Sequence, residues 1–109
     1  MKYMMFVVTD LEPDTTPDDS DVELWVDELD SSGKRLIGEV LEPPAKSTVV
    51  RVRDGKLHVT DGPFAETKEW IAGFDILECE NLDEAIAIAS KHPMARNGQL
   101  EIRPFMVWE

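Results

Sequence analysis

The segment STVVRVRDGKLHVTDGPF, residues 47–64, carries the clearest structural signal in the chain. Two short runs rich in β-branched residues flank Asp54-Gly55, a dipeptide typical of a two-residue hairpin turn. Such a turn fixes the register, so that Arg53 pairs with Lys56, and each residue before Arg53 pairs with the corresponding residue after Lys56. Side-chain alternation then predicts a buried aliphatic face made of Val50, Val52, Leu57 and Val59.

Strands and helices flank this hairpin on both sides. Strand patterns cover residues 3–8, 34–41, 70–77 and 99–109. The first is continuously apolar, which predicts a central strand, and Pro104 marks the last as an edge or bulged strand. One helix is predicted from a Thr16-Pro17 cap to Gly33, and a second from an Asn81 cap to the His92-Pro93 stop.

Periodicity assigns a buried face to each flanking element. The first helix is expected to bury Val22, Trp25, Val26 and Leu29. The second helix is expected to bury Leu82, Ala85, Ile86 and Ala89. In the strand at 70–77, the apolar positions that alternate with smaller or polar ones are Trp70, Ala72, Phe74 and Ile76.

The order β-α-β, hairpin, β, α, β predicts the fold class. It is typical of an α+β fold of the ferredoxin-like, split-βαβ kind, with a mainly antiparallel sheet, two helices on one face and the hairpin as an addition. The length of 109 residues predicts a single domain over residues 1–109. The second sheet face needs a cover, which a homodimer packed sheet against sheet would supply.

Composition excludes several classes of function. A net charge of −12 argues against direct binding to nucleic acid and to anionic membranes, since both require clustered cations. The single cysteine, Cys79, permits neither an internal disulfide nor a cysteine zinc site. The apolar start of the chain is too short for a signal peptide or a membrane span, so we expect a cytoplasmic protein.

The corner Asp61-Gly62-Pro63-Phe64 has two interpretations. Gly62 and Pro63 make a rigid turn, which Asp61 can cap and Phe64 can anchor, and this structural role explains all four residues. The hairpin register, however, continues the Leu57 and Val59 row to Asp61 and directs its carboxylate toward the core. A buried carboxylate needs a partner, as carboxylates in acid–base sites do.

The histidines and the cations of the hairpin also have alternative roles. His92 stands at a helix C-terminus, where the macrodipole favours imidazolium, so it is either a helix cap or a general acid or base. His58 lies on the polar face of the hairpin, which also carries Arg51, Arg53 and Lys56. That face either binds an anion or pairs with acids such as Asp27, Glu28 or Asp30.

Cofactor and metal signals are absent from the sequence. Asp61, Glu66 and His92 could supply metal ligands, but no typical ligand spacing is present, so we expect no metal. No glycine-rich phosphate loop or nucleophile motif is found either. We therefore expect no cofactor.

The motifs DGPFAETKE (61–69), HP (92–93) and GQLEIRP (98–104), together with most of the chain, resemble the YCII-related family and specifically its DGPF subgroup. The resemblance implies a small bacterial homodimer of the dimeric α+β barrel type. In the wider family, a histidine early in the first helix and an aspartate before a proline are associated with catalysis. Here the first helix has no histidine and His92 takes the pre-proline position. Asp21 or Glu23 is therefore a candidate partner for His92, with Asp61 as the rival.

Two functions remain open at this point. The first is a cofactor-independent acid–base enzyme, with His92 and Asp61 as catalytic residues and a small molecule as substrate. Its ligand-binding candidates, in and beside the DGPF loop, are Phe64, Glu66, Lys68 and Trp70. The alternative is a non-catalytic ligand-binding or regulatory module. The resemblance links such a module to alternative sigma factors, because relatives are often encoded beside them.

Overall fold

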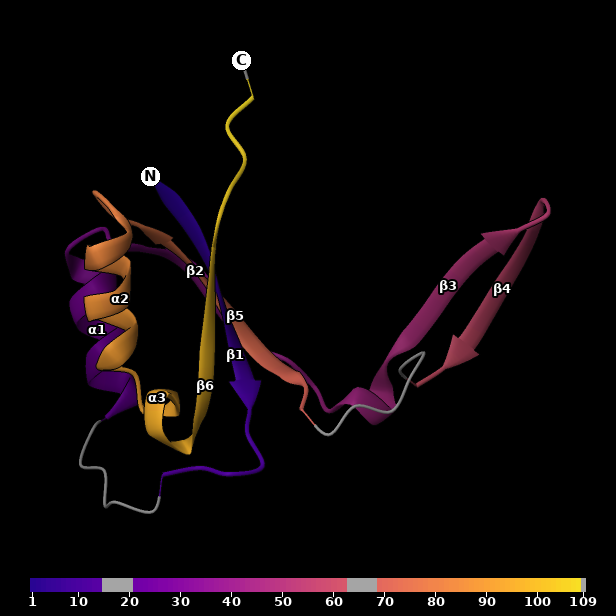
Figure 1. Ribbon diagram of the computed structural model, residues 1–109, viewed down its shortest axis with the longest axis horizontal. Coiled ribbons are helices and arrows are strands. Elements are labelled where there is room, and N and C mark those ends of the chain that lie inside the picture. The colour runs from indigo at the N-terminus through magenta and orange to yellow at the C-terminus, as the bar shows by residue number, and fades with distance from the viewer. Residues whose placement is uncertain (15–20, 63–68, 109) are drawn as a thin grey trace.

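The computed structural model describes residues 1–14, 21–62 and 69–108. In chain order the elements are β1 (Lys2–Thr9), α1 (Val22–Ser31), β2 (Arg35–Val40), the 3-10 turn η1 (Pro44–Lys46), β3 (Thr48–Arg53), β4 (Lys56–Asp61), β5 (Ile71–Glu78), α2 (Leu82–Ser90), α3 (Met94–Asn97) and β6 (Gly98–Pro104). Four strands form an antiparallel sheet in the order β2-β5-β1-β6, while β3 and β4 form a separate hairpin (Figure 1). The predicted α+β class, the central first strand and the edge position of the last strand are confirmed.

Side-chain caps fix where the two longer helices begin. Asp21 accepts a hydrogen bond from the backbone N–H of Glu23, so α1 begins at Val22. This differs from the predicted start, whose cap, Thr16, lies outside the described residues. Asn81 accepts a hydrogen bond from the N–H of Glu84, which confirms the predicted start of α2.

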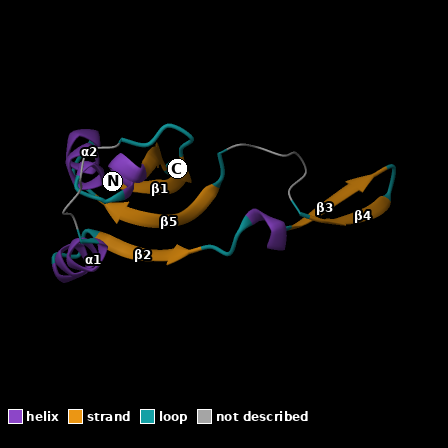
Figure 2. Ribbon diagram, turned by 90° about the horizontal axis from the view of Figure 1, so that it is seen from below, coloured by secondary structure: helices purple, strands orange, loops and turns teal. Residues whose placement is uncertain are grey.

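The core lies between one sheet face and the two helices, which Figures 1 and 2 show on the same side of the sheet. Its buried members include Tyr3, Met5, Trp25, Leu29, Leu77, Ala85, Ile88 and Ala89. The prediction for α2 is wrong in part, because Leu82 and Ile86 are exposed and Ile88 is buried instead. Val22 in α1 is likewise exposed.

Strand β5 turns alternate side chains, one of them a carboxylate, toward the helices. Gly73, Asp75 and Leu77 are buried, whereas Phe74 and Ile76 lie half-buried on the sheet face that the helices leave uncovered. The predicted alternation is therefore present, but the apolar set occupies the uncovered face. A carboxylate consequently lies beneath the helix layer, where it needs a partner.

The β3–β4 hairpin projects away from the rest of the chain (Figures 1 and 2). Its predicted register is confirmed, since Arg53 pairs with Lys56 and Val50 with Val59. Its predicted burial is wrong, because the four aliphatic side chains of Val50, Val52, Leu57 and Val59 are 62%, 59%, 66% and 56% exposed. Asp61 is exposed as well, so its carboxylate does not enter the core. The turn fixes the pairing, but it does not determine what covers either face.

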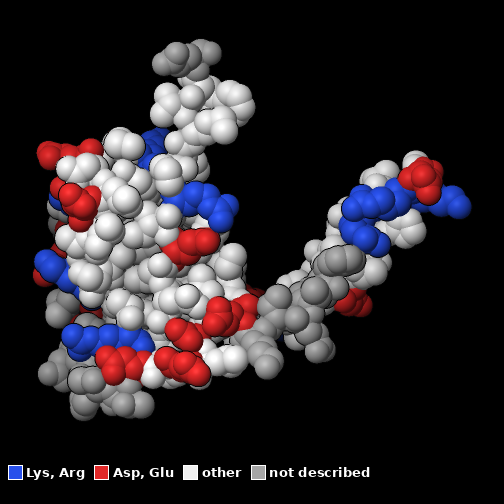
Figure 3. Space-filling view, in the orientation of Figure 1, with Lys and Arg blue, Asp and Glu red and all other residues white. Residues whose placement is uncertain are grey.

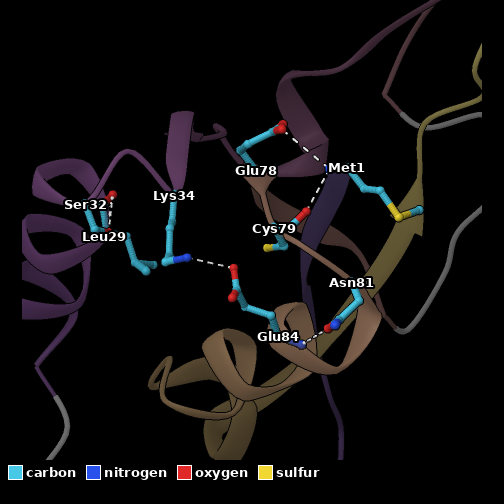
Figure 4. Close-up of polar contacts among 8 residues, drawn as sticks. All are labelled: Met1, Leu29, Ser32, Lys34, Glu78, Cys79, Asn81 and Glu84. Atoms are coloured by element: carbon cyan, nitrogen blue, oxygen red, sulfur yellow. Dashed lines mark hydrogen bonds and ion pairs between the residues drawn. The ribbon is translucent and has the colours of Figure 1, made fainter.

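Polar contacts join the end of the sheet to α2 (Figure 4). Lys34 Nζ lies 2.8 Å from Glu84 Oε1, and the amino group of Met1 donates to the carbonyl of Cys79 at 2.7 Å. Cys79 is packed in the core, and burial raises the pKa of its thiol. Within the described ranges, no helix is both long and apolar enough to span a bilayer.

Candidate functional site

A cleft of about 840 Å³ lies between α1, the facing parts of β2 and β5, and the corner that leads into α3. Its apolar walls include Val7, Val22, Trp25, Val26, Val40 and Pro93. Its polar lining includes Asp21, Arg35, Glu39, Asp75 and His92. The volume falls within the range of about 300–1,000 Å³ that is typical of small-molecule sites.

His92 is held in the wall of this cleft by two neighbours. The backbone N–H of Met94 donates to His92 Nδ1 at 2.9 Å, and the Trp25 ring meets the imidazole edge-on with 4.7 Å between ring centroids. Trp25 is itself fixed, because its indole N–H donates to the carbonyl of Ile88 at 2.9 Å. Since Nδ1 accepts a hydrogen bond, the proton of the neutral ring resides on Nε2.

Burial also determines the charge of this imidazole. His92 is only 8% exposed, and desolvation lowers its pKa below the usual value. Desolvation therefore opposes the imidazolium form that the helix C-terminus is expected to favour. His92 is consequently a neutral hydrogen-bond donor near pH 7.

The Nε2 atom is available to a ligand. Among the described residues, every side-chain nitrogen or oxygen that is fully shielded from solvent has a hydrogen-bond partner. Nε2 has no partner among these residues, so it is not one of the fully shielded atoms. Nε2 is therefore not sealed in the core, and His92 lines the cleft. Its N–H can donate to an acceptor that enters the cleft.

A buried ion pair forms another part of the lining. Arg35 Nε donates to Asp75 Oδ1 at 2.7 Å, and Arg35 Nη1 donates to Asp30 at 3.0 Å. Burial raises the pKa of Asp75, and the bond to Arg35 partly opposes that rise. For Arg35, burial disfavours the charged guanidinium, but the hydrogen bonds to the two carboxylates more than compensate, so its pKa is raised.

Gly38 provides the space for this pair. It lies opposite Asp75 in the β2–β5 register, and a Cβ atom there would overlap Asp75 Oδ1 and approach the Arg35 guanidinium. A side chain at position 38 would therefore displace one of the two charged groups.

The structure brings together some of the predicted site residues and separates others. Asp21 and His92 line the same cleft, whereas Glu23 is not part of its lining. Asp61 lies on the projecting hairpin, and Trp70, which is 41% exposed, is also outside the lining. The ligand-binding candidates Phe64, Glu66 and Lys68 lie outside the described residues.

The remaining sequence candidates take surface positions. His58 is exposed on the hairpin, and Asp30, one of the suggested partners for the hairpin cations, pairs with Arg35 instead. Among the described residues, no group of three or more His, Cys, Asp or Glu side chains could hold a metal ion.

Sequence reasoning did not identify Arg35, Gly38 and Asp75. One signal was present, since Asp75 interrupts a strand whose neighbours are apolar. Its partner is 40 residues away, and only the β2–β5 pairing brings the two together.

Burial of neutral His92 predicts a pH-dependent stability. The folded-state pKa is depressed, so below about pH 6.5 the unfolded chain binds a proton that the folded chain resists. The contribution of His92 to the free energy of unfolding is therefore constant above that pH. Below it, the free energy of unfolding declines as pH falls, by at most about 1.4 kcal/mol per pH unit. Urea unfolding at pH 7.5, 6.5 and 5.5 measures this.

The variant His92→Asn is the matched control, because its amide oxygen can still accept from the Met94 N–H. Other titrating groups are common to both chains, so the difference between their pH slopes isolates His92. Equal slopes for the two chains would show that His92 is not buried as the neutral ring.

Comparisons with known proteins give a family match and an uncharacterized relative. The family model for the YCII-related domain matches residues 1–109. An uncharacterized protein of Rhizobium meliloti (strain 1021) is 38% identical over 71 residues. This alignment covers 63% of the chain and 57% of the length of the relative.

Proposed function

This chain belongs to the YCII-related domain family, and from that premise we propose that it is a cofactor-independent acid–base enzyme acting on a small molecule. The proposal places the reaction in the cleft between α1 and the sheet. It is carried by one observation: the neutral His92 and the carboxylate of Asp21 line the same cleft. A hydrogen-bond donor and a proton acceptor are thereby available to one ligand.

The chemistry assigns a different role to each group. Asp21 Oδ1 accepts the N–H of Glu23, which orients the carboxylate and leaves Oδ2 for a substrate proton. The Nε2–H of His92 donates to a carbonyl oxygen as negative charge develops on it. The carboxylate removes a proton from the carbon beside that carbonyl, the electron pair moves to the oxygen, and return of the proton completes an isomerisation or exchange without oxidation.

The lining limits the class of substrate. Among the described residues that line the cleft, Asp21, Glu39 and Asp75 supply three carboxylates against one cation, Arg35. Such a site disfavours anionic ligands and favours neutral or cationic ones. With walls that are mainly apolar, it fits a small carbonyl compound that is neutral or carries an amine.

Deuterium exchange tests the proposal directly. A panel of small ketones and amino ketones is incubated with the protein in D2O, and loss of the proton signal beside each carbonyl is followed by NMR. We expect accelerated exchange for at least one compound, reduced by about 100-fold or more in His92→Asn and in Asp21→Asn. Both variants are expected to keep the fold. Asparagine at 92 can accept a hydrogen bond from the Met94 N–H, and asparagine at 21 is a good helix cap.

Two outcomes would contradict catalysis in this cleft. Binding in the cleft without accelerated exchange would favour the alternative, a non-catalytic ligand-binding or regulatory module. Exchange that persists in both variants would place the chemistry outside this cleft.

We also propose that the chain forms a homodimer related to the ferredoxin-like, dimeric α+β barrels. The support is the sheet face opposite the helices, which carries Met4, Phe6, Val8, Ala72, Phe74 and Ile76 at half-buried positions. Contact of this face with a second copy would remove these side chains from water. Sedimentation equilibrium measures this, with a dimer mass as the expected result and a monomer as the contradicting one.

A further inference from the structure

The β3–β4 hairpin forms an arm, defined as residues 48–61, that has little tertiary support from the other residues that the structure describes. Its two strands make their contacts chiefly with each other. The radius of gyration, 16.4 Å, exceeds the value of about 13 Å expected for a compact chain of this length. We propose that the arm packs its aliphatic face against the uncovered sheet face of a second copy of this chain.

The aliphatic face of the arm requires a cover. Val50, Val52, Leu57 and Val59 share one face through the register and are all more than half exposed. An isolated two-stranded hairpin is at best marginally stable in water, so the arm needs packing from another surface. A contiguous exposed aliphatic face of this kind marks an interaction site.

The connection to the body holds the arm away from its own sheet. Pro43 and Pro44 fix their backbone angles, and the turn η1 is closed by bonds from the N–H groups of Lys46 and Ser47 to the carbonyls of those prolines. The Gly62 N–H donates to the Ser47 carbonyl at 2.6 Å, which ties the two ends of the arm together. Both ribbon views place the arm on the side of the sheet opposite the helices, separated from it (Figures 1 and 2).

A second copy presents a surface of matching chemistry and size. The uncovered face carries apolar side chains from β1 and β5, including Phe6, Phe74 and Ile76. The six-residue strands of the arm extend about 20 Å, which is comparable with the eight-residue strands of that face. A two-fold axis would allow each copy to cover the other, as an isologous dimer requires.

Charge also favours a second copy. The arm carries three cations against Asp54 and Asp61, for a net charge of +1, which leaves −13 on the rest of the chain. Figure 3 shows Lys and Arg side chains along the arm and many acidic side chains on the body. Arg51, Arg53 and Lys56 lie on the polar face of the arm, away from the proposed contact, so their attraction to the acidic body of a second copy acts at longer range and guides association.

Charge insertion on the arm tests the proposal by sedimentation equilibrium in 0.5 M NaCl, where surface charges are strongly screened. The double variant Val52→Glu/Leu57→Glu is expected to weaken the dimer by about 100-fold or more, because it places two charges in an apolar contact. The control His58→Glu/Thr60→Glu adds the same charge to the opposite face of the arm, and its dissociation constant is expected to stay within about 3-fold of the parent.

Cross-linking tests where the arm lies. In a Cys79→Ala background, Leu57→Cys and Phe74→Cys chains are mixed and treated with a short bis-maleimide. A cross-linked pair of unlike chains is expected, and His58→Cys in place of Leu57→Cys is expected to give much less. A negative result for the Leu57 and Phe74 pair in a dimeric protein would overturn the proposal.

The possible results distinguish the arm contact from dimer formation itself. A dimer that resists Val52→Glu/Leu57→Glu overturns the arm contact and leaves a dimer formed by the sheets alone. A monomeric parent at 100 µM overturns both the dimer and the arm contact. Neither result affects the exchange reaction assigned to the cleft.

Discussion

Replacing Arg35 with leucine is expected to lower the free energy of unfolding by about 3 kcal/mol near pH 7, because the change leaves a buried carboxylate without its partner. Asp75 has a side chain that is only 8% exposed, and its 2.7 Å bond to Arg35 Nε would be lost. Chemical denaturation of the two chains at equal ionic strength measures the difference.

The pH dependence of that deficit identifies its cause. Burial raises the pKa of Asp75, and without Arg35 the rise is larger. A carboxyl whose folded-state pKa is raised destabilises the protein when ionised, so the deficit is largest at neutral pH and shrinks as pH falls and Asp75 is protonated.

A second substitution serves as the control. Asp75→Asn in the Arg35→Leu chain removes the stranded charge and is expected to restore more than half of the lost stability. If Arg35→Leu alone costs less than about 1 kcal/mol, the pair does not stabilise this sheet in the way that we describe.

Gly38→Ala is expected to destabilise the protein by about 2 kcal/mol or more, although glycine-to-alanine changes at ordinary backbone angles usually stabilise. The added Cβ would overlap Asp75 Oδ1, and Arg35 occupies the other side of the same space. Either the ion pair breaks or β2 moves away from β5.

A double-mutant cycle separates these causes. In the Arg35→Leu/Asp75→Asn chain, the cost of Gly38→Ala is expected to fall to less than half of its value in the parent. An unchanged cost would show that the alanine clashes with the backbone and not with the charged pair.

Much of the fold could be predicted from local signals. Asp54-Gly55 gave the hairpin register, Asn81 gave the start of α2, and Pro104 gave the edge position of β6. In each case the deciding interaction lies within a few residues of the signal, so no knowledge of the tertiary structure was needed.

The errors concern what covers a surface. Alternation showed that Val50 and Leu57 share a face, but not that the hairpin would stand away from the sheet. In β5 it showed two faces, but not that Asp75 would be on the helix side, since a partner for that carboxylate was not apparent. Burial and ion pairing are non-local properties, and a single sequence contains little information about them.

In the candidate site, too, some residues have local signals in the sequence and others depend on tertiary contacts. His92 could be identified from its position at the end of the second helix, whereas Asp21 was one of two alternative carboxylates suggested by the family resemblance, and the fold brings both to one cleft. The sequence placed His92 at a helix terminus but not beside Trp25 and Met94, in a position where burial lowers its pKa. Arg35, which contacts Asp30 in α1 and Asp75 in β5, depended entirely on tertiary pairing.

The proton on His92 decides whether the cleft can work as proposed. Long-range 1H–15N NMR of the imidazole at pH 7 distinguishes the two neutral forms and the cation. The neutral Nε2–H form is expected, because Nδ1 accepts the Met94 N–H and burial lowers the pKa. An imidazolium at pH 7, or a proton on Nδ1, would contradict the assignment of His92 as the neutral donor in this site.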